Sequence, residues 1–271
     1  MNNSISDEKV REDEYSLFPR LSDKYVYLIA FFVGLIVLTI GSFLFIGPFV
    51  NYTDALKGSN FEEKIEQFQK MVTEYQGVLM LLSEVVGIGC AVLVFRKVFI
   101  EDFKKIKKYF LRFIICLVAG IIAITALGSL FEWIQVKLGI EGSSENQEVI
   151  EEILSGNGKW FMILSVAIGA PIFEELVFRK FIYGYLSRTK LPIILSIAIT
   201  ALVFALIHCT SENFLSWTAY FFLANYLVLA LSLTLPYVFS KENIYVSILV
   251  HMFNNILSLL FFYGVFNVAI W

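Results

Sequence analysis

Seven long apolar runs divide this chain of 271 residues, and they limit its fold more than any other feature. A helix needs about 20 apolar residues to cross the hydrocarbon core of a bilayer. Open strands and loops cannot satisfy their backbone hydrogen bonds in lipid, so each run predicts a transmembrane helix. The predicted spans are residues 25–50, 77–95, 113–134, 160–187, 191–208, 214–239 and 244–270.

The composition agrees with a membrane protein. The chain is 58% hydrophobic and only 17% charged, whereas a soluble domain is about one quarter charged. No basic cluster is interleaved with aromatic residues in a soluble stretch, so nucleic acid is excluded as a partner and membrane lipid is expected. We predict an all-α fold, a polytopic transmembrane helical bundle of about seven spans, with eight as the alternative.

The connections predict short surface helices. Residues 61–75 have helical spacing of apolar and charged positions and predict an amphipathic surface helix, and a second short helix is expected near 145–155. Residues 96–112 form a strongly basic connection. We interpret residues 1–24 as a cytoplasmic N-terminal tail and residues 25–271 as a single transmembrane domain.

Lysine and arginine predict the orientation in the membrane, because cytoplasmic loops are enriched in both. With the N-terminus in the cytoplasm, the inner segments hold roughly three times as many of these residues as the outer segments. This bias supports seven spans in a cell membrane, with an extracytoplasmic C-terminus.

The fourth predicted span contains two adjacent carboxylates, Glu174 and Glu175, followed by Arg179. Ionisable groups inside a bilayer are costly and usually have a function. Glu175 and Arg179 lie four residues apart on one helix face and can pair. Glu174 then points to a different neighbour. Pro171 lacks an N–H and predicts a kink just before the carboxylates.

Both histidines of the chain also fall in predicted spans. Phe204 and His208 lie four residues apart at the end of the fifth span. His251 and Asn255 have the same spacing in the seventh, and the neighbouring Asn254 is expected to join helices by hydrogen bonds. If both histidines meet the carboxylates, the bundle contains a polar site.

Such a site could hydrolyse a peptide bond. A carboxylate with one histidine can activate water, and a second imidazole with an amide can stabilise an oxyanion. Zinc is the alternative, because two histidines and a carboxylate are common zinc ligands; the set would be Glu174, His208 and His251. The usual His-Glu-x-x-His helix is absent, and the residues alone leave both mechanisms open.

Three motifs resemble those of the CAAX prenyl endopeptidase and bacteriocin-processing (CPBP or Abi) family. They are Glu-Glu-x-x-x-Arg at 174–179, Phe-x-x-x-His at 204–208 and His-x-x-x-Asn at 251–255, and the likeness covers about 160–257. The resemblance implies an intramembrane endopeptidase of glutamate or metalloprotease type. It implies catalytic roles for Glu174, His208, His251 and Asn255. It implies supporting roles for Glu175, Arg179 and Phe204.

The resemblance implies a peptide or membrane-protein substrate, and links bacterial members to bacteriocin self-immunity and peptide maturation. A non-catalytic immunity or regulatory partner and a transporter are the competing hypotheses. One geometric difficulty accompanies all three. Counting from the span ends, His208 and His251 should differ in depth by roughly 10 Å.

Overall fold

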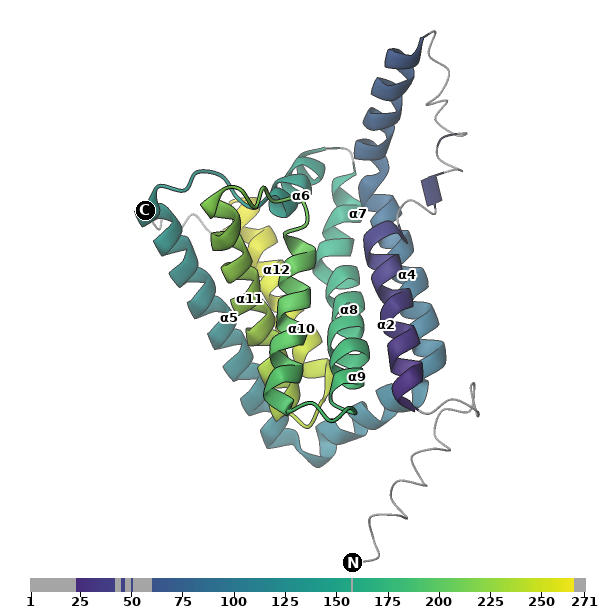
Figure 1. The fold of residues 1–271 in the computed structure, drawn as a ribbon, viewed down its shortest axis with the longest axis vertical. Helices are drawn as coiled ribbons and strands as arrows, with labels where there is room; N and C mark the ends of the chain where they lie inside the picture. The colour runs from purple at the N-terminus through teal and green to yellow at the C-terminus, as the bar shows by residue number, and fades with distance from the viewer. Residues whose placement is uncertain (1–22, 42–44, 47–49, 51–59, 157, 266–271) are drawn as a thin grey trace, which may run out of the picture.

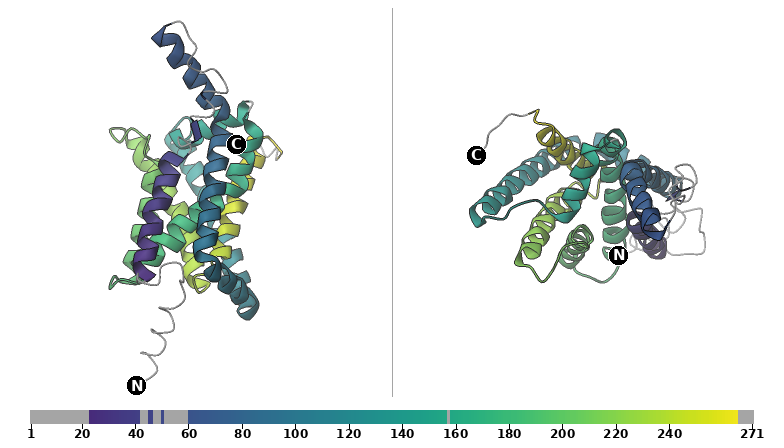
Figure 2. Two further views of the ribbon diagram at one scale, coloured as in Figure 1. Left: turned by 90° about the vertical axis from the view of Figure 1, so that its right-hand side faces the viewer. Right: turned by 90° about the horizontal axis from the view of Figure 1, so that it is seen from above.

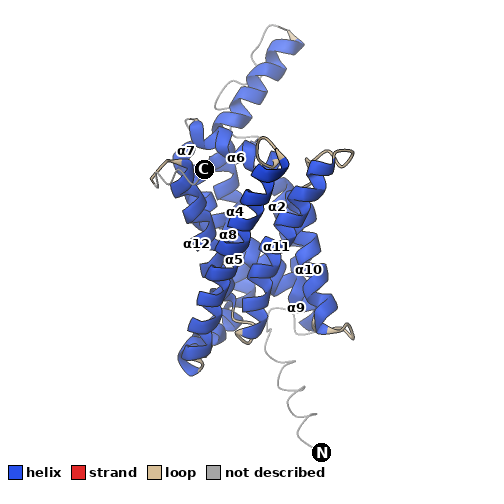
Figure 3. Cartoon of the chain, turned by 90° about the vertical axis from the view of Figure 1, so that its left-hand side faces the viewer, coloured by secondary structure: helices blue, strands red, loops and turns tan. Residues whose placement is uncertain are grey.

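The chain forms a helical bundle in a computed structural model, which describes residues 23–41, 45–46, 50, 60–156 and 158–265. Within those ranges the chain is helical apart from turns and short loops (Figure 3). The predicted fold class, an all-α polytopic bundle, is confirmed. The predicted tail at 1–24 lies almost wholly outside the described residues.

The helices follow the predicted spans in order (Figure 1). The fourth span is one long helix that changes register twice, from α-helix to π-helix (η) and back. The elements are α2 (Asp23–Ile40), α4 (Phe61–Lys108), α5 (Phe110–Leu138), α6 (Glu145–Ser155), α7 (Lys159–Leu164), η2 (Ser165–Gly169), α8 (Ala170–Glu175), η3 (Leu176–Tyr183), α9 (Gly184–Leu186), α10 (Ile193–His208), α11 (Trp217–Phe239) and α12 (Ile244–Phe262).

Five described helices are long and apolar enough to cross a membrane, and two shorter apolar helices accompany them. The five are α4, α5, the composite helix at Lys159–Leu186, α11 and α12; the shorter two are Tyr25–Leu38 and Ile193–His208. Large apolar side chains cover their outer faces, for example Leu93, Leu111 and Ile194. The chain is therefore a multi-pass membrane protein. The predicted span 25–50 continues beyond α2 into residues that are only partly described.

The predictions for residues 61–112 were wrong in one respect. The expected surface helix at 61–75 is the N-terminal part of α4 and runs directly into the second span. The predicted end of that span agrees with the structure, because α4 is kinked at Phe95, and the basic residues up to Lys108 follow the kink. No proline interrupts residues 61–95, and each glycine in a helix costs only about 1 kcal/mol relative to alanine. At 1.5 Å per residue the part of α4 before the kink is roughly 50 Å long, so its N-terminal turns project beyond the bundle (Figures 1 and 2). The predicted short helix near 145–155 is confirmed as α6.

Close packing brings α4 against the helix that carries the carboxylates. A side chain at Gly87 would collide with the ring of Phe173, which is almost fully buried. The composite helix also contacts α10 and α12, and α10 packs along α11. As a result, α8, η3, α10 and α12 converge in the middle of the bundle.

The start of α12 is fixed inside the protein by Asp102 of α4. The Asp102 carboxylate accepts a hydrogen bond from the Ile244 N–H at 3.1 Å and pairs with Lys180 of η3. Asn243 donates to the Asp102 carbonyl at 2.8 Å, and Lys180 donates to the Glu242 carbonyl at 2.9 Å. Asp102 is fully buried, so this network links three helices without solvent.

We expect Asp102→Ala to lower the free energy of unfolding by about 3 kcal/mol or more, because it leaves the buried Lys180 charge without its partner. Unfolding by SDS in mixed micelles measures the change. Glu101→Ala is the matched control. Glu101 is the exposed neighbour of Asp102, so its replacement should change stability by less than about 0.5 kcal/mol. Equal midpoints for the two variants would contradict the prediction.

Candidate active site

Glu174 lies between the two histidines. Its Oε2 atom is 3.6 Å from His208 Nε2 and 3.9 Å from His251 Nε2. The side chains of Glu174 and His208 are 14% and 16% exposed, and that of His251 is 4% exposed. The structure thus brings together three of the four predicted catalytic residues, from α8, α10 and α12, around one oxygen atom.

The other nitrogen of each imidazole is anchored to an acceptor. His208 Nδ1 lies 2.9 Å from the carbonyl oxygen of Phe204, and His251 Nδ1 lies 2.9 Å from Glu175 Oε1. A carbonyl accepts and does not donate, and neither does a carboxylate, so Nδ1 carries the proton on both rings. Both Nε2 atoms therefore face Glu174. The two rings differ in their second partner, which is neutral for His208 and anionic for His251.

The expected pair of Glu175 and Arg179 is confirmed. Arg179 Nη1 lies 2.9 Å from Glu175 Oε1, and both side chains are fully buried. The guanidinium also donates to the carbonyl of Ala230 in α11 at 3.2 Å and lies 5.1 Å from the centre of the Phe204 ring. Because one Glu175 oxygen serves both Arg179 and His251, the ion pair fixes the orientation of His251.

The amide of Asn255 is anchored to a backbone carbonyl of the π-helix η2. Its Nδ2 donates to Val166 O at 2.9 Å, and its Oδ1 accepts from Asn254 Nδ2 at 3.3 Å. In η2 the Ala170 N–H donates to Ser165 O, so the next N–H in this pattern would come from residue 171. Residue 171 is proline and has no N–H. The Val166 carbonyl is thereby left for Asn255.

The structure therefore places Asn255 differently from the other three residues. One N–H of its amide is used by Val166 O, and its second N–H is the one that could reach a ligand. Pro171 is the second residue of α8 and follows η2 by one residue, and the kink expected there stays a prediction.

Tyr226 of α11 is a site residue that the sequence did not single out. Its ring lies 5.0 Å from the His208 ring, whose other neighbour is the stacked ring of Phe204 at 4.2 Å. The Tyr226 hydroxyl bonds to Ser144 at 2.8 Å and to Asn146 at 3.3 Å, at the start of α6. No motif or charge marks Tyr226, because its role comes only from packing against His208.

The predicted zinc ligands do not fit a metal in this arrangement. Ligands of a tetrahedral zinc ion lie roughly 3.3 Å apart, given bonds near 2.0 Å. Both separations at Glu174 are longer, at 3.6 and 3.9 Å. Over the described ranges, no three His, Cys, Asp or Glu side chains are placed to hold a metal ion. We therefore derive no step through a metal.

The depth difference expected for the two histidines is not present, since both Nε2 atoms lie within 4 Å of Glu174 Oε2. The starting points of the helices contribute to this. Ile244 at the start of α12 is fully buried and held by Asp102, whereas Ile193 and Ile194 at the start of α10 are exposed. Counting residues from the span ends therefore gave a wrong separation for the two histidines.

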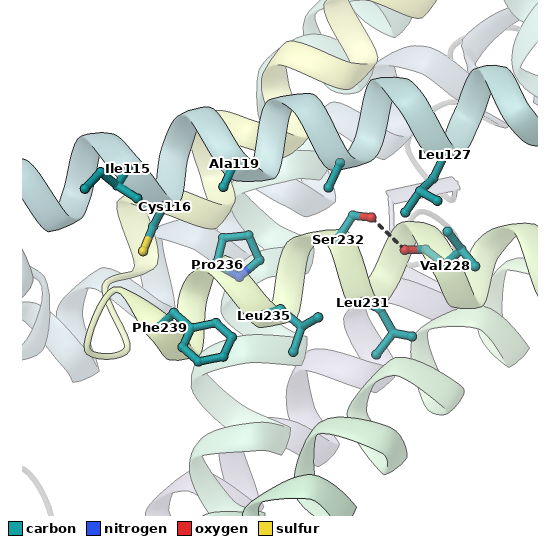
Figure 4. A pocket seen from close by; sticks show the side chains of 11 residues that line it. Ile115, Cys116, Ala119, Leu127, Val228, Leu231, Ser232, Leu235, Pro236 and Phe239 are labelled. Carbon is teal, nitrogen blue, oxygen red and sulfur yellow. Dashed lines mark hydrogen bonds between the residues drawn. The ribbon is translucent and has the colours of Figure 1, made fainter.

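A separate cavity of about 500 Å³ lies between α5 and α11 (Figure 4). Small side chains such as Ala119 and Ala123 leave this space, and Pro236 lines the opposite wall. Its lining includes the hydroxyl residue Ser232, which donates to the Val228 carbonyl at 2.9 Å. No ionisable carboxylate or histidine lines this cavity, so it is not the place of the polar chemistry.

Comparisons with known proteins match the part of the chain that contains this site. Residues 156–257 match the family model for type II CAAX prenyl endopeptidase, Rce1-like. The chain is also similar to UPF0177 protein YbdI of Lactococcus lactis subsp. lactis (strain IL1403), with 33% identity over 102 residues; the match covers 38% of this chain and 49% of that relative. No solved structure matches the chain. The part of the chain that carries the glutamate–histidine site is thus similar to the Rce1-like family of type II CAAX prenyl endopeptidases.

Proposed function

We propose that the protein is an intramembrane endopeptidase that hydrolyses a peptide bond of a membrane-associated peptide or protein with water activated by Glu174. The observation that carries this proposal is the convergence of His208 Nε2 and His251 Nε2 on one Glu174 oxygen. The separations are too long for direct hydrogen bonds, but they suit one water within hydrogen-bond reach of all three atoms. The family match supports the same reaction class.

In the proposed reaction Glu174 takes a proton from this water, and the water oxygen attacks the carbonyl carbon of the scissile bond. His208 holds the water from its other side, because its Nε2 atom is free to accept. When the tetrahedral intermediate collapses, the C–N bond breaks and Glu174 returns the proton to the amine nitrogen. The second proton of the water stays on the new carboxyl group, so the products are a carboxylic acid and an amine, and no covalent enzyme intermediate forms.

The remaining donors stabilise the oxyanion. His251 already donates from Nδ1 to Glu175, so donation from Nε2 as well makes its ring an imidazolium. The negative charge of Glu175 lies beside that cation. The second N–H of Asn255 is the other donor. The carbonyl beside His208 Nδ1 fits a neutral ring that accepts from the water. The carboxylate beside His251 Nδ1 fits a cationic ring that donates to the oxyanion.

The cellular test compares the membrane and secreted peptides of cells that carry either the wild-type protein or Glu174→Gln. The proposal predicts substrates that accumulate uncut in the variant and new peptide ends that occur only with the wild type. Immunoblots must show equal amounts of both proteins in the membrane. Identical peptide patterns, with full biological function of Glu174→Gln, would instead favour the non-catalytic immunity or regulatory partner.

Tyr226 should affect turnover through the position of His208. Tyr226→Phe keeps the ring beside His208, while Tyr226→Ala removes it and should lower kcat by about 10- to 100-fold, since small displacements of reacting groups are costly. Tyr220→Ala is the matched control, because this tyrosine of the same helix is 57% exposed. Wild-type kcat in purified Tyr226→Ala would show that the ring contact does not position His208.

A further inference from the structure

Glu84 of α4 is a third buried carboxylate close to the site, and the proposed reaction does not use it. Glu84 is only 5% exposed, although the opposite face of α4 is covered by exposed apolar side chains. Its Oε1 atom accepts a hydrogen bond from Ser165 at 2.7 Å, and its Oε2 atom is buried with no hydrogen-bond partner. A buried carboxylate with one donor is costly, so its contacts need an explanation.

The Glu84 carboxylate touches both ends of the π-helix η2. Ser165 is the first residue of η2 and donates to Oε1. Gly169 is the last residue, and a Cβ added there would overlap Glu84 Oε2. Only glycine leaves room for this oxygen. The carboxylate therefore spans the turn from its first residue to its last.

The same turn holds Asn255. The carbonyl that accepts from the Asn255 amide belongs to Val166, the residue directly after Ser165. That carbonyl is free because Ala170 donates to Ser165 O and Pro171 has no N–H. Any change in the π-helical register would move the carbonyl or give it a helical partner, and the amide of Asn255 would lose its anchor.

We propose that Glu84 is a positioning residue for the reaction, which holds η2 in its π-helical register and thereby orients Asn255 toward the oxyanion. The kinetic part rests on the proposed function, whereas the structural part does not. Glu84 lies outside residues 156–257, the part of the chain that matches the family model. The proposed role is met by a hydrogen-bond acceptor of the right length and needs no negative charge.

The structural test uses the protein in lipid nanodiscs with ¹⁵N in asparagine side chains, and Asn255→Ala assigns the Asn255 amide signal. In Glu84→Ala that signal should shift, whereas Glu84→Gln, which keeps an acceptor for Ser165, should leave it near its wild-type position. Glu132→Ala is the control, because this carboxylate of α5 is exposed. An unchanged Asn255 signal in folded Glu84→Ala would overturn the proposal, even if no substrate were known.

The kinetic test uses a quenched peptide substrate identified from the peptide comparison. We expect Glu84→Ala to lower kcat by about 10- to 100-fold with KM within about twofold, and Glu84→Gln to stay within about threefold of the wild type. In an Asn255→Ala background, Glu84→Ala should add almost nothing, because the two act as one unit. Multiplicative losses would overturn the coupling. Full turnover in Glu174→Gln would refute the proposed function and leave the nanodisc result intact.

Discussion

Purified Glu174→Gln should lose about 10³-fold or more of its peptide-bond hydrolysis, while keeping its fold. General acid–base catalysis contributes about 10²- to 10⁴-fold, and the amide of glutamine can neither take a proton from water nor return one to the amine. The amide has nearly the same shape, and it removes a partly buried charge. The free energy of unfolding should therefore stay equal or rise. Turnover in nanodiscs and SDS unfolding measure the two quantities.

Glu175→Gln is the matched control, since it changes the adjacent carboxylate in the same way. Its amide oxygen can still accept from His251, but the fully buried Arg179 loses the negative charge of the carboxylate with which it pairs. This variant should lose stability and retain more activity than Glu174→Gln. If the two variants lost activity equally at equal stability, Glu174 would not be the base.

The second large effect concerns the ion pair itself. Arg179→Met should lower the free energy of unfolding by about 3 to 5 kcal/mol, because it leaves the Glu175 carboxylate charged, fully buried and without its guanidinium partner. It also removes the hydrogen bond to the Ala230 carbonyl. The shift of the SDS unfolding midpoint provides the measurement.

The double variant Glu175→Met/Arg179→Met separates charge from packing. Replacing a buried pair by apolar residues of similar volume is often neutral for stability. The double variant should therefore be more stable than Arg179→Met alone. It should still be inactive, because His251 has lost the acceptor for its Nδ1 proton. A double variant less stable than the single one would show that the pair itself stabilises the bundle.

The sequence predicted the helices well because apolar runs in lipid leave one solution, a helix. It could not predict that residues 61–75 extend the second span as the first turns of α4. The polar residues at 61–75 indicate surface chemistry, yet nothing in them stops a helix. The basic residues follow the kink at Phe95, in agreement with the predicted end of the span. The π-helices were equally hidden, since register depends on what the neighbouring helices offer to the freed carbonyls.

For the site, the sequence supplied residue types and the structure supplied partners. Spacing of four residues was enough to predict the pair of Glu175 and Arg179 on one helix face. It could not show that both histidines aim Nε2 at Glu174, because that depends on acceptors at Phe204 and Glu175. No sequence pattern indicated Tyr226, because aromatic residues are common in membrane helices and only the structure shows its ring beside His208.

The contacts made by Asp102 show that the limits of family resemblance are not the limits of a self-sufficient unit. The matched segment carries Lys180 and the first turn of α12, but both depend on a carboxylate that precedes the segment by more than 50 residues. A fragment that starts at residue 156 would leave the buried ammonium group of Lys180 without its carboxylate partner. It would also leave the first turn of α12 without its hydrogen bond to Asp102. Moving the glutamate–histidine site into another scaffold therefore requires carrying the central part of α4 along with it.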